Sequence, residues 1–283
     1  MANNIELFKS YVPMLDEVYK AAALTSVLDG AAELAREGVN ANELVIPMMS
    51  MDGLADYDRN TGYVAGDVTM TNETVKCNFD RGRMFSIDTL DNAETAGIAY
   101  GRLASEFIRT KVVPELDAFR LAAYASAEGI SKATPAALTT GANVVSALRE
   151  AANKMDEDEV PAEQRYLFIT PTLASLIDDL DTTKSRAILE RFAAVIRAPQ
   201  SRMYTAINQA NGGYSKAEGA KNINFVVVHK AAAIQFQKHV SPKVITPEQN
   251  QSADAWKFGY RNVGIAEVYK NKVAGIYLHA STT

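Results

Sequence analysis

Cysteine and histidine are scarce in this 283-residue sequence, which contains one cysteine, Cys77, and three histidines. A lone cysteine excludes an internal disulfide and a cysteine-rich metal cluster, and synthesis in a reducing cytoplasm is the simplest interpretation. His229, His239 and His279 lack the i, i+4 spacing of a helical zinc site. His229 and His279 each end a strand-like run, so we interpret them as strand-end residues and predict no metal site.

The motifs of common enzymes are also missing. Gly212-Gly213 is not followed by the Lys-Ser/Thr pair of a phosphate-binding loop, and we interpret it as part of a flexible loop. No Gly-x-Ser-x-Gly elbow occurs. The acidic run from Asp156 to Glu159 is more typical of a solvated loop than of a cation site. We therefore predict that the chain is not an enzyme and has no catalytic residues and no cofactor.

Long apolar runs and an excess of positive charge are absent as well. The sequence contains no run of about 18 apolar residues, so no membrane span is predicted. The first residues lack a basic region followed by an apolar one, so we expect no secretory signal. Lys and Arg total 29 against 34 Asp and Glu, which gives a net charge of −5. Tight wrapping of nucleic acid by the isolated chain is therefore not expected.

What the sequence does have is 47% hydrophobic residues, enough for one large or two modest domains. Roughly the first 40 residues predict small Ala-rich helices with little core of their own. The apolar positions at helical spacing are Val12, Leu15, Val18 and Tyr19, then Val27, Leu28, Ala31 and Leu34.

From Leu44 the pattern changes to strand-like segments separated by turn residues. Asp58 to Gly62 is one predicted turn and Asp80 to Arg83 is another, while Met84 to Ile87 predicts a short strand. A two-stranded ribbon is marginal in water, so we expect it to rest on a neighbouring molecule. The predicted subunit-interface residues are Arg59, Tyr63, Arg81 and Arg83. The arginines would serve either phosphate contact or ion pairs with acidic neighbours.

A long helix is predicted next, capped by Asp91 or Asn92 and ending near Gly129. Its length would be roughly 55 Å at about 1.5 Å per residue. Pro114 lies inside it and is expected to kink or restart the helix.

The remainder predicts a compact α/β unit followed by closing strands. The expected elements are a helix over Asn143 to Met155, buried strands at Tyr166 to Ile169 and Asn224 to Val228, and a short helix over Lys230 to Val240. A looser Asn- and Gly-rich segment separates the two strands. The last strands are expected around Trp256 and over Val273 to Leu278, with a hairpin turn at Asn271.

The order of these elements resembles the major capsid proteins of tailed bacteriophages with the Hong Kong ninety-seven fold. Three stretches carry the resemblance. They are Phe79 to Asp88 running into Thr95, the kinked helix around Val113 to Arg120, and Asp254 to Lys257 through Gly275 to His279.

The resemblance implies an α+β fold with five parts. These are an N-terminal arm (1–43), an extended β-hairpin loop or β-ribbon (44–90), a spine helix with the peripheral domain (91–136), an α/β axial domain (137–240) and returning strands of the peripheral domain (241–283).

It also implies a structural protein of the virion capsid, made in the bacterial host cytoplasm. Copies would form hexamers and pentamers of an icosahedral head around double-stranded DNA, which is held without sequence specificity. Many members of this family carry a long N-terminal scaffolding segment ahead of the extended loop. Only about 43 residues precede the ribbon here, so a separate scaffolding protein is expected. A portal is a further expected partner, and decoration proteins are further candidates. Lys76, the only lysine of the ribbon, is not expected to form a crosslink.

Two alternatives remain open at this point. One is an encapsulin-like bacterial compartment that encloses enzyme cargo, and the other is an α/β enzyme with an undetected site.

Overall fold

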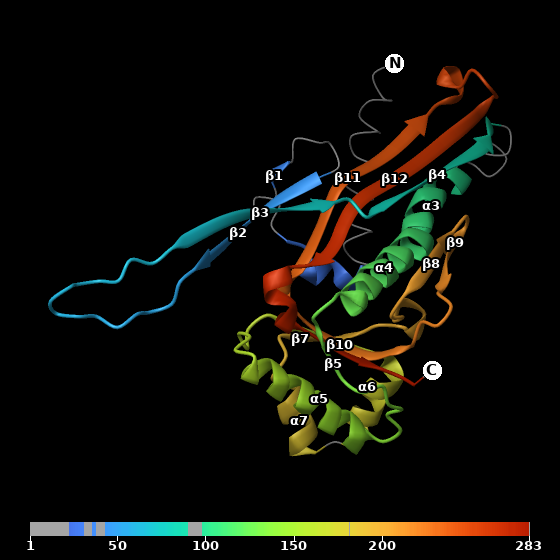
Figure 1. The fold of residues 1–283 in the computed structure, drawn as a ribbon. Coiled ribbons are helices and arrows are strands. Elements are labelled where there is room, and N and C mark those ends of the chain that lie inside the picture. The colour runs from blue at the N-terminus through green and yellow to red at the C-terminus, as the bar shows by residue number, and fades with distance from the viewer. Residues whose placement is uncertain (1–22, 31–35, 38–42, 90–97, 181, 283) are drawn as a thin grey trace.

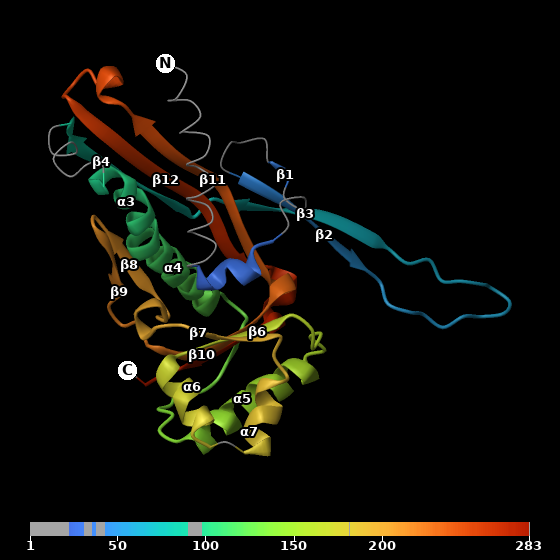
Figure 2. The ribbon, with the colours of Figure 1, turned by 180° about the vertical axis from the view of Figure 1, so that it is seen from behind.

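The computed structural model describes residues 23–30, 36–37, 43–89, 98–180 and 182–282. An α/β unit lies at one end, a three-stranded sheet with a long helix lies at the other, and a thin ribbon projects from the side (Figure 1). Figure 2 shows the same arrangement from behind. Within the described residues no helix is both long enough and apolar enough to cross a membrane.

The ribbon is formed by β2 (Glu43–Met51) and β3 (Val68–Lys76), with the two-residue β1 (Arg36–Glu37) beside β2. β2 and β3 pair antiparallel from Glu43–Lys76 out to Met51–Val68. A loop of residues 52–67 closes the far end. The extended hairpin expected from the sequence is therefore present.

A three-stranded antiparallel sheet has the order β11-β12-β4, with β4 (Phe79–Asp88), β11 (Ala233–Ile245) and β12 (Ala255–Val268). The predicted turn over Asp80 to Arg83 is wrong, because these residues lie inside β4 and pair with β12. Gly82 is needed there for close approach, since a Cβ atom would lie 2.9 Å from the Tyr260 carbonyl oxygen.

The predicted helix over Lys230 to Val240 is also wrong. Only Lys230–Ala232 forms a short 3-10 turn, and the rest belongs to β11. Ile234 and Gln235 point to opposite faces of this strand, where Ile234 packs with Val75 and Gln235 bonds the buried Tyr124 hydroxyl. The alternation has a period of two, which suits a strand.

The spine consists of α3 (Ile98–Phe107), a π-helical segment (Ile108–Val112) and α4 (Val113–Ser126). The predicted caps, Asp91 and Asn92, lie outside the described residues. Pro114 stands in the first turn of α4, where its missing N–H group costs least. The irregularity falls in the π-helical turn before it. The helix ends at Ser126, and Gly129 follows with φ of +77°.

The α/β unit contains a five-stranded sheet of order β5-β13-β10-β6-β7. Its strands are β5 (Ser131–Lys132), β6 (Arg165–Ile169), β7 (Ala194–Arg197), β10 (Ile223–His229) and β13 (Ile276–Ala280). One core lies between this sheet and α5 (Gly141–Glu157), α6 (Pro171–Asp178) and α7 (Thr183–Leu189). A second core lies on the opposite face, against α4 and the 3-10 helix Leu24–Leu28.

The placement of the last strand differs from the prediction. β13 pairs with β10 inside the five-stranded sheet, not with the strands around Trp256. The predicted hairpin at Asn271 is absent among the described residues, because Lys270–Gly275 forms a 3-10 segment that leads from one sheet to the other. Gly275 permits the crossing, since a Cβ atom there would lie 2.6 Å from that of Ala232. The domain boundaries themselves remain predictions.

The N-terminal segment is tied to the spine by a buried carboxylate. Asp117 of α4 is fully buried and accepts hydrogen bonds from the Leu24 and Thr25 backbone N–H groups, both at 3.1 Å. It also accepts from the Thr25 hydroxyl at 2.6 Å and from the Arg202 guanidinium at 2.9 Å. Of the predicted helix, Val27 and Leu28 lie in this 3-10 helix, whereas Val12 to Tyr19, Ala31 and Leu34 lie outside the described residues.

Candidate interaction surfaces

The ribbon exposes an unusual number of large apolar side chains. Of eleven such exposed side chains in the described residues, eight belong to this one element, and Leu54 and Tyr63 are almost fully exposed. Within the described residues, no second layer covers these side chains. An apolar surface of this kind marks a contact with another molecule. The eight residues are Met49, Met51, Leu54, Tyr57, Tyr63, Val64, Val68 and Met70.

The far end of the ribbon, residues 52–67, is called the ribbon tip. Its loop is shaped by local contacts: Asp58 pairs with Gly62 as a β-bridge, and the Tyr57 and Tyr63 rings meet edge to face at 4.9 Å. Gly62 adopts φ of +81°, which favours glycine. Two of the predicted interface residues, Arg59 and Tyr63, are exposed on this tip.

The other two predicted residues, Arg81 and Arg83, lie on β4 and face the spine. Arg81 donates to Glu115 Oε1 at 2.8 Å and to the Ala210 carbonyl at 2.7 Å. It thus bonds within its own subunit and joins β4, α4 and a small hairpin. Arg83 is exposed and has no hydrogen bond or ion pair to the described part of the chain.

That hairpin consists of β8 (Ile207–Ala210) and β9 (Gly213–Lys216). The interpretation of Gly212-Gly213 as a flexible loop is wrong, because Ala210 pairs with Gly213 and a two-residue turn connects the strands. Asn211-Gly212 is a strong sequence signal for such a turn, and it could have identified the hairpin.

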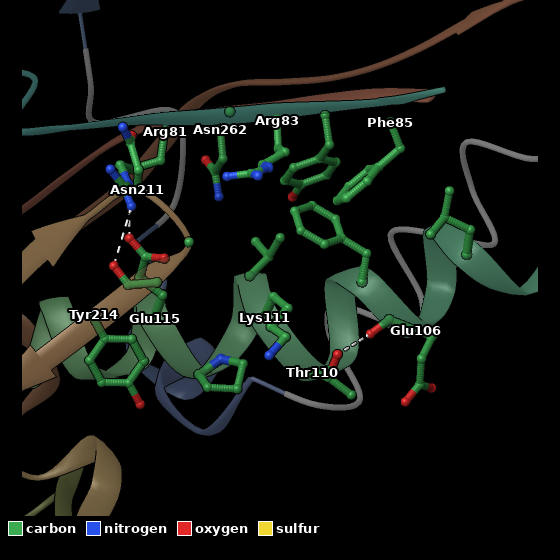
Figure 3. Close-up of a pocket in the computed structure, with 18 of the residues that line it drawn as sticks. Arg81, Arg83, Phe85, Glu106, Thr110, Lys111, Glu115, Asn211, Tyr214 and Asn262 are labelled. Carbon is green, nitrogen blue, oxygen red and sulfur yellow. Dashed lines mark hydrogen bonds and ion pairs between the residues drawn. The ribbon is translucent and has the colours of Figure 1, made fainter. Parts of the chain in front are cut away.

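A cavity of about 830 Å³, here called the spine pocket, lies between the β4–β12 face, the spine and the β8–β9 hairpin (Figure 3). One wall is aromatic: the rings of Phe85 and Phe107 meet at 4.8 Å, and those of Phe107 and Tyr260 at 6.3 Å. Lys111 also lines the pocket. The spine contributes through its π-helical turn, a feature that often accompanies functional sites.

Asn262 is the most unusual residue of the spine pocket. It is only 1% exposed, yet neither its side-chain oxygen nor its nitrogen has a hydrogen-bond partner in the described residues. A buried polar group without a partner costs about 1–3 kcal/mol. Nothing in the sequence distinguishes this asparagine, because the feature depends on what surrounds it in three dimensions.

No group of three metal-ligating side chains occurs in the described residues. His279 lies inside β13, where its Nδ1 is 3.0 Å from the Asn224 amide nitrogen, and burial lowers its pKa. His229 ends β10, and burial together with the nearby Arg165 charge lowers its pKa. Both are strand residues, as expected, while the side chain of His239 lies outside the described set.

Comparison with known proteins gives similarity in structure but not in sequence. No family model and no curated protein matches the chain. A chain of the mature capsid of bacteriophage PhiM1 is 12% identical with a TM-score of 0.62, over 86% of this chain and 82% of that one. A chain from Mycobacterium phage Che8 is 13% identical with a TM-score of 0.58, over 91% and 90%.

The chain has the Hong Kong ninety-seven fold of tailed-phage capsids. A virus-like particle from Pyrococcus furiosus also matches, at 10% identity and a TM-score of 0.57 over 93% of this chain and 98% of that one. The α+β capsid fold expected from the order of elements is therefore confirmed, although sequence identity to each of these structures is very low.

Proposed function

We propose that this protein is a major capsid protein that assembles with copies of itself into the icosahedral head of a bacteriophage. The observation that carries the proposal is the ribbon, which exposes eight large apolar side chains among the described residues. The capsid fold supports the same conclusion. Hexamers and pentamers would close the shell around double-stranded DNA.

The size of the exposed surface supports an obligate contact. Full burial of one large apolar side chain is worth about 1.5–3 kcal/mol. Half burial of the eight side chains on a neighbour would therefore contribute on the order of 10 kcal/mol to each subunit contact. This is enough to offset much of the entropic cost of association, which is about 4–15 kcal/mol.

The position of the ribbon supports rings rather than simple dimers. It projects from one side of the subunit in both views (Figures 1 and 2). A projection that binds a different surface on the next copy makes a head-to-tail contact, and such contacts form rings where the rotation between copies closes. Five- and six-membered rings are the units that an icosahedral shell requires.

The further partners follow from this function. A net charge of −5 opposes tight DNA binding by the subunit itself. The shell would therefore enclose packaged DNA without sequence specificity. A scaffolding protein and a portal would set the size and the unique vertex of the head, and the virion capsid would be the protein's location.

The proposal is tested by assembly of the full chain. The purified protein, alone or co-expressed with the scaffolding protein encoded beside it, should form closed shells visible by negative-stain microscopy. Particles from the native source should contain double-stranded DNA, whereas enclosed enzyme cargo would support the compartment alternative. A subunit that stays monomeric with its own scaffold would contradict the proposal.

A further inference from the structure

Three chain segments connect the α/β unit with the spine and the three-stranded sheet, and the place where they meet is here called the junction (Figure 1). They are residues 127–130 after α4, Lys230–Ala232 after β10, and Lys270–Gly275 between β12 and β13. The Tyr269 backbone N–H donates to the Ala232 carbonyl at 3.0 Å, and a Cβ atom on Gly275 would lie 3.3 Å from that of His229. His229, the last residue of β10, is therefore buried inside the junction.

The loop between α5 and β6 packs beside the junction and is fastened by one buried side chain. Arg165 is only 2% exposed and donates to the Pro161 carbonyl at 2.9 Å and to Asp156 Oδ1 at 2.7 Å. The Lys230 backbone N–H donates to the Gln164 carbonyl at 3.0 Å, which joins the loop to the junction. The position of Arg165 thus decides how the loop is held.

The backbone of this loop is strained. Glu159 and Gln164 have φ of +56° and +59°, and no other non-glycine residue in the described part of the chain has a positive φ. Such conformations persist only where the surrounding contacts impose them. Arg165 supplies contacts of this kind, so the loop would relax if that side chain were displaced.

His229 lies among positively charged side chains. It pairs directly with Arg165 across β10 and β6, so the imidazole and the guanidinium lie on the same face of the sheet. Lys272 of the junction also acts on the ring, which in addition has a hydrogen bond with the Glu163 backbone. Lys230 follows in the sequence. A proton on the imidazole would therefore add one more positive charge to this group.

The carboxylate that bonds Arg165 is already shared. Asp156 pairs with both Arg165 and Arg191. Burial and the Arg165 charge lower the pKa of His229 below its ordinary value of 6.5, although the Glu163 backbone acts in the opposite direction. The folded subunit therefore holds the His229 imidazole in its neutral form at neutral pH.

We infer that His229 and Arg165 form an acid-sensitive lock on the junction. A proton taken up by His229 places two positive charges on directly opposed residues, and such charges repel each other. Arg165 then leaves the Pro161 carbonyl, the strained loop relaxes, and the contact between loop and junction opens. This inference goes beyond the proposed function, because the lock operates in the single subunit whether or not shells form.

Proteolysis of the loop measures the opening. Endoproteinase Glu-C would cleave after Glu159 and Glu163 when the loop opens, so the cleavage rate follows the open population. The unassembled full chain would be compared at about pH 7.5 and about pH 5.5, on either side of the ordinary histidine pKa. Each rate is normalised to that of a peptide of residues 155–168 at the same pH. The normalised rate should be at least about fivefold higher in acid, and His229→Gln, which cannot take up the proton, should remove this increase.

Two further variants serve as controls. His279→Gln removes a second buried histidine of the same sheet, which contacts Asn224 near the far end of β13, and it should keep the acid increase. His229→Lys places a permanent positive charge opposite Arg165 and should be cleaved at about pH 7.5 as fast as the parent is at about pH 5.5. Far-UV circular dichroism should show the same secondary structure in both variants as in the parent.

The titration of His229 connects the proton to the opening. In nuclear magnetic resonance spectra, the imidazole Cε1–H signal of His229 is the one that His229→Gln lacks. Its chemical shift and the normalised cleavage rate should change with the same midpoint pH. A histidine that only fills space would give no such agreement.

The outcomes decide for or against the lock. An acid increase that disappears in His229→Gln, persists in His279→Gln and shares the His229 midpoint supports the inference. A parent whose normalised cleavage does not change with pH overturns it, and so does an increase that persists in His229→Gln. Equally fast cleavage of His229→Gln at both pH values also overturns it, because the ring would then have only a structural role. None of these results bears on shell assembly, so the proposed function is tested separately.

Discussion

Excision of the ribbon tip tests how much of assembly depends on this one loop. Residues 52–67 would be replaced by Asn-Gly, the pair preferred in a two-residue hairpin turn. Met51 and Val68 already face each other at the end of the ribbon, so the new turn closes the hairpin without changing its register. The fold of the rest of the subunit should be unaffected.

The expected size of the effect follows from the side chains that are removed. The loop carries four of the exposed apolar residues, Leu54, Tyr57, Tyr63 and Val64. At half burial in a contact they contribute about 3–6 kcal/mol. Since each 1.4 kcal/mol corresponds to tenfold in an equilibrium constant, each contact should weaken by about a hundredfold to ten-thousandfold.

Two measurements together decide the outcome. Light scattering and sedimentation should show shell formation shifted to much higher protein concentration or abolished. Thermal unfolding of the unassembled subunit should change by no more than about 0.5 kcal/mol, because the loop contributes nothing to the buried core. Shells that form at the parental concentration would refute the reasoning, since the exposed side chains would then have no part in assembly.

Three further predictions concern buried groups. Asn262→Leu should stabilise the unassembled subunit by about 1–2 kcal/mol, because an unsatisfied amide is removed; denaturant unfolding measures this, and a loss of stability would contradict it. Asp117→Ala should destabilise the subunit by about 3–5 kcal/mol, because Arg202 and Thr25 lose their buried partner; denaturant unfolding measures this. Burial lowers the pKa of His229 and His279 below the ordinary value of 6.5, so the unfolded chain binds more protons and stability should fall as pH drops below about 6.5. The variant His229→Gln/His279→Gln should show a flatter pH dependence of the thermal midpoint, and an unchanged slope would contradict this assignment.

Elements with a strong local pattern could be predicted from the sequence. The buried strand over Tyr166 to Ile169 lies in β6, and the helix over Asn143 to Met155 lies in α5. The helix has apolar residues at helical spacing, and the strand is a short apolar run that contains aromatic residues and is too short for a helix. The order of elements was also sufficient to predict the capsid fold.

The errors arose where distant pairing decides the structure. Asp80 to Arg83 has the composition of a turn, but β12 pairs with it across more than half of the sequence. Lys230 to Val240 begins with good helix formers, but β11 is held by β12. Val273 to Leu278 is apolar enough for either sheet, so its location could not be read from composition.

The interaction surfaces were predictable only in part. Arg59 and Tyr63 were predicted at an interface because a two-stranded ribbon is marginal in water and was expected to rest on a neighbouring molecule. Asn262 and the spine pocket could not be found, because an asparagine is notable only when its neighbours leave it unsatisfied. Whether the four predicted residues touch another subunit stays a prediction.

The π-helical turn in the spine determines which side chains of α3 and α4 share one face. The buried spine residues Ala104 and Ile108 are four positions apart, whereas Ile108 and Val113 are five apart. A regular helix with 3.6 residues per turn rotates by about 100° per residue. The π-helical turn absorbs this additional residue, so that Ile108 and Val113, five positions apart, still face the same core. Deleting one residue from 108–112 would leave the four-residue spacing of a regular helix, and the inward-facing side chains of α3 and α4 would keep their orientation.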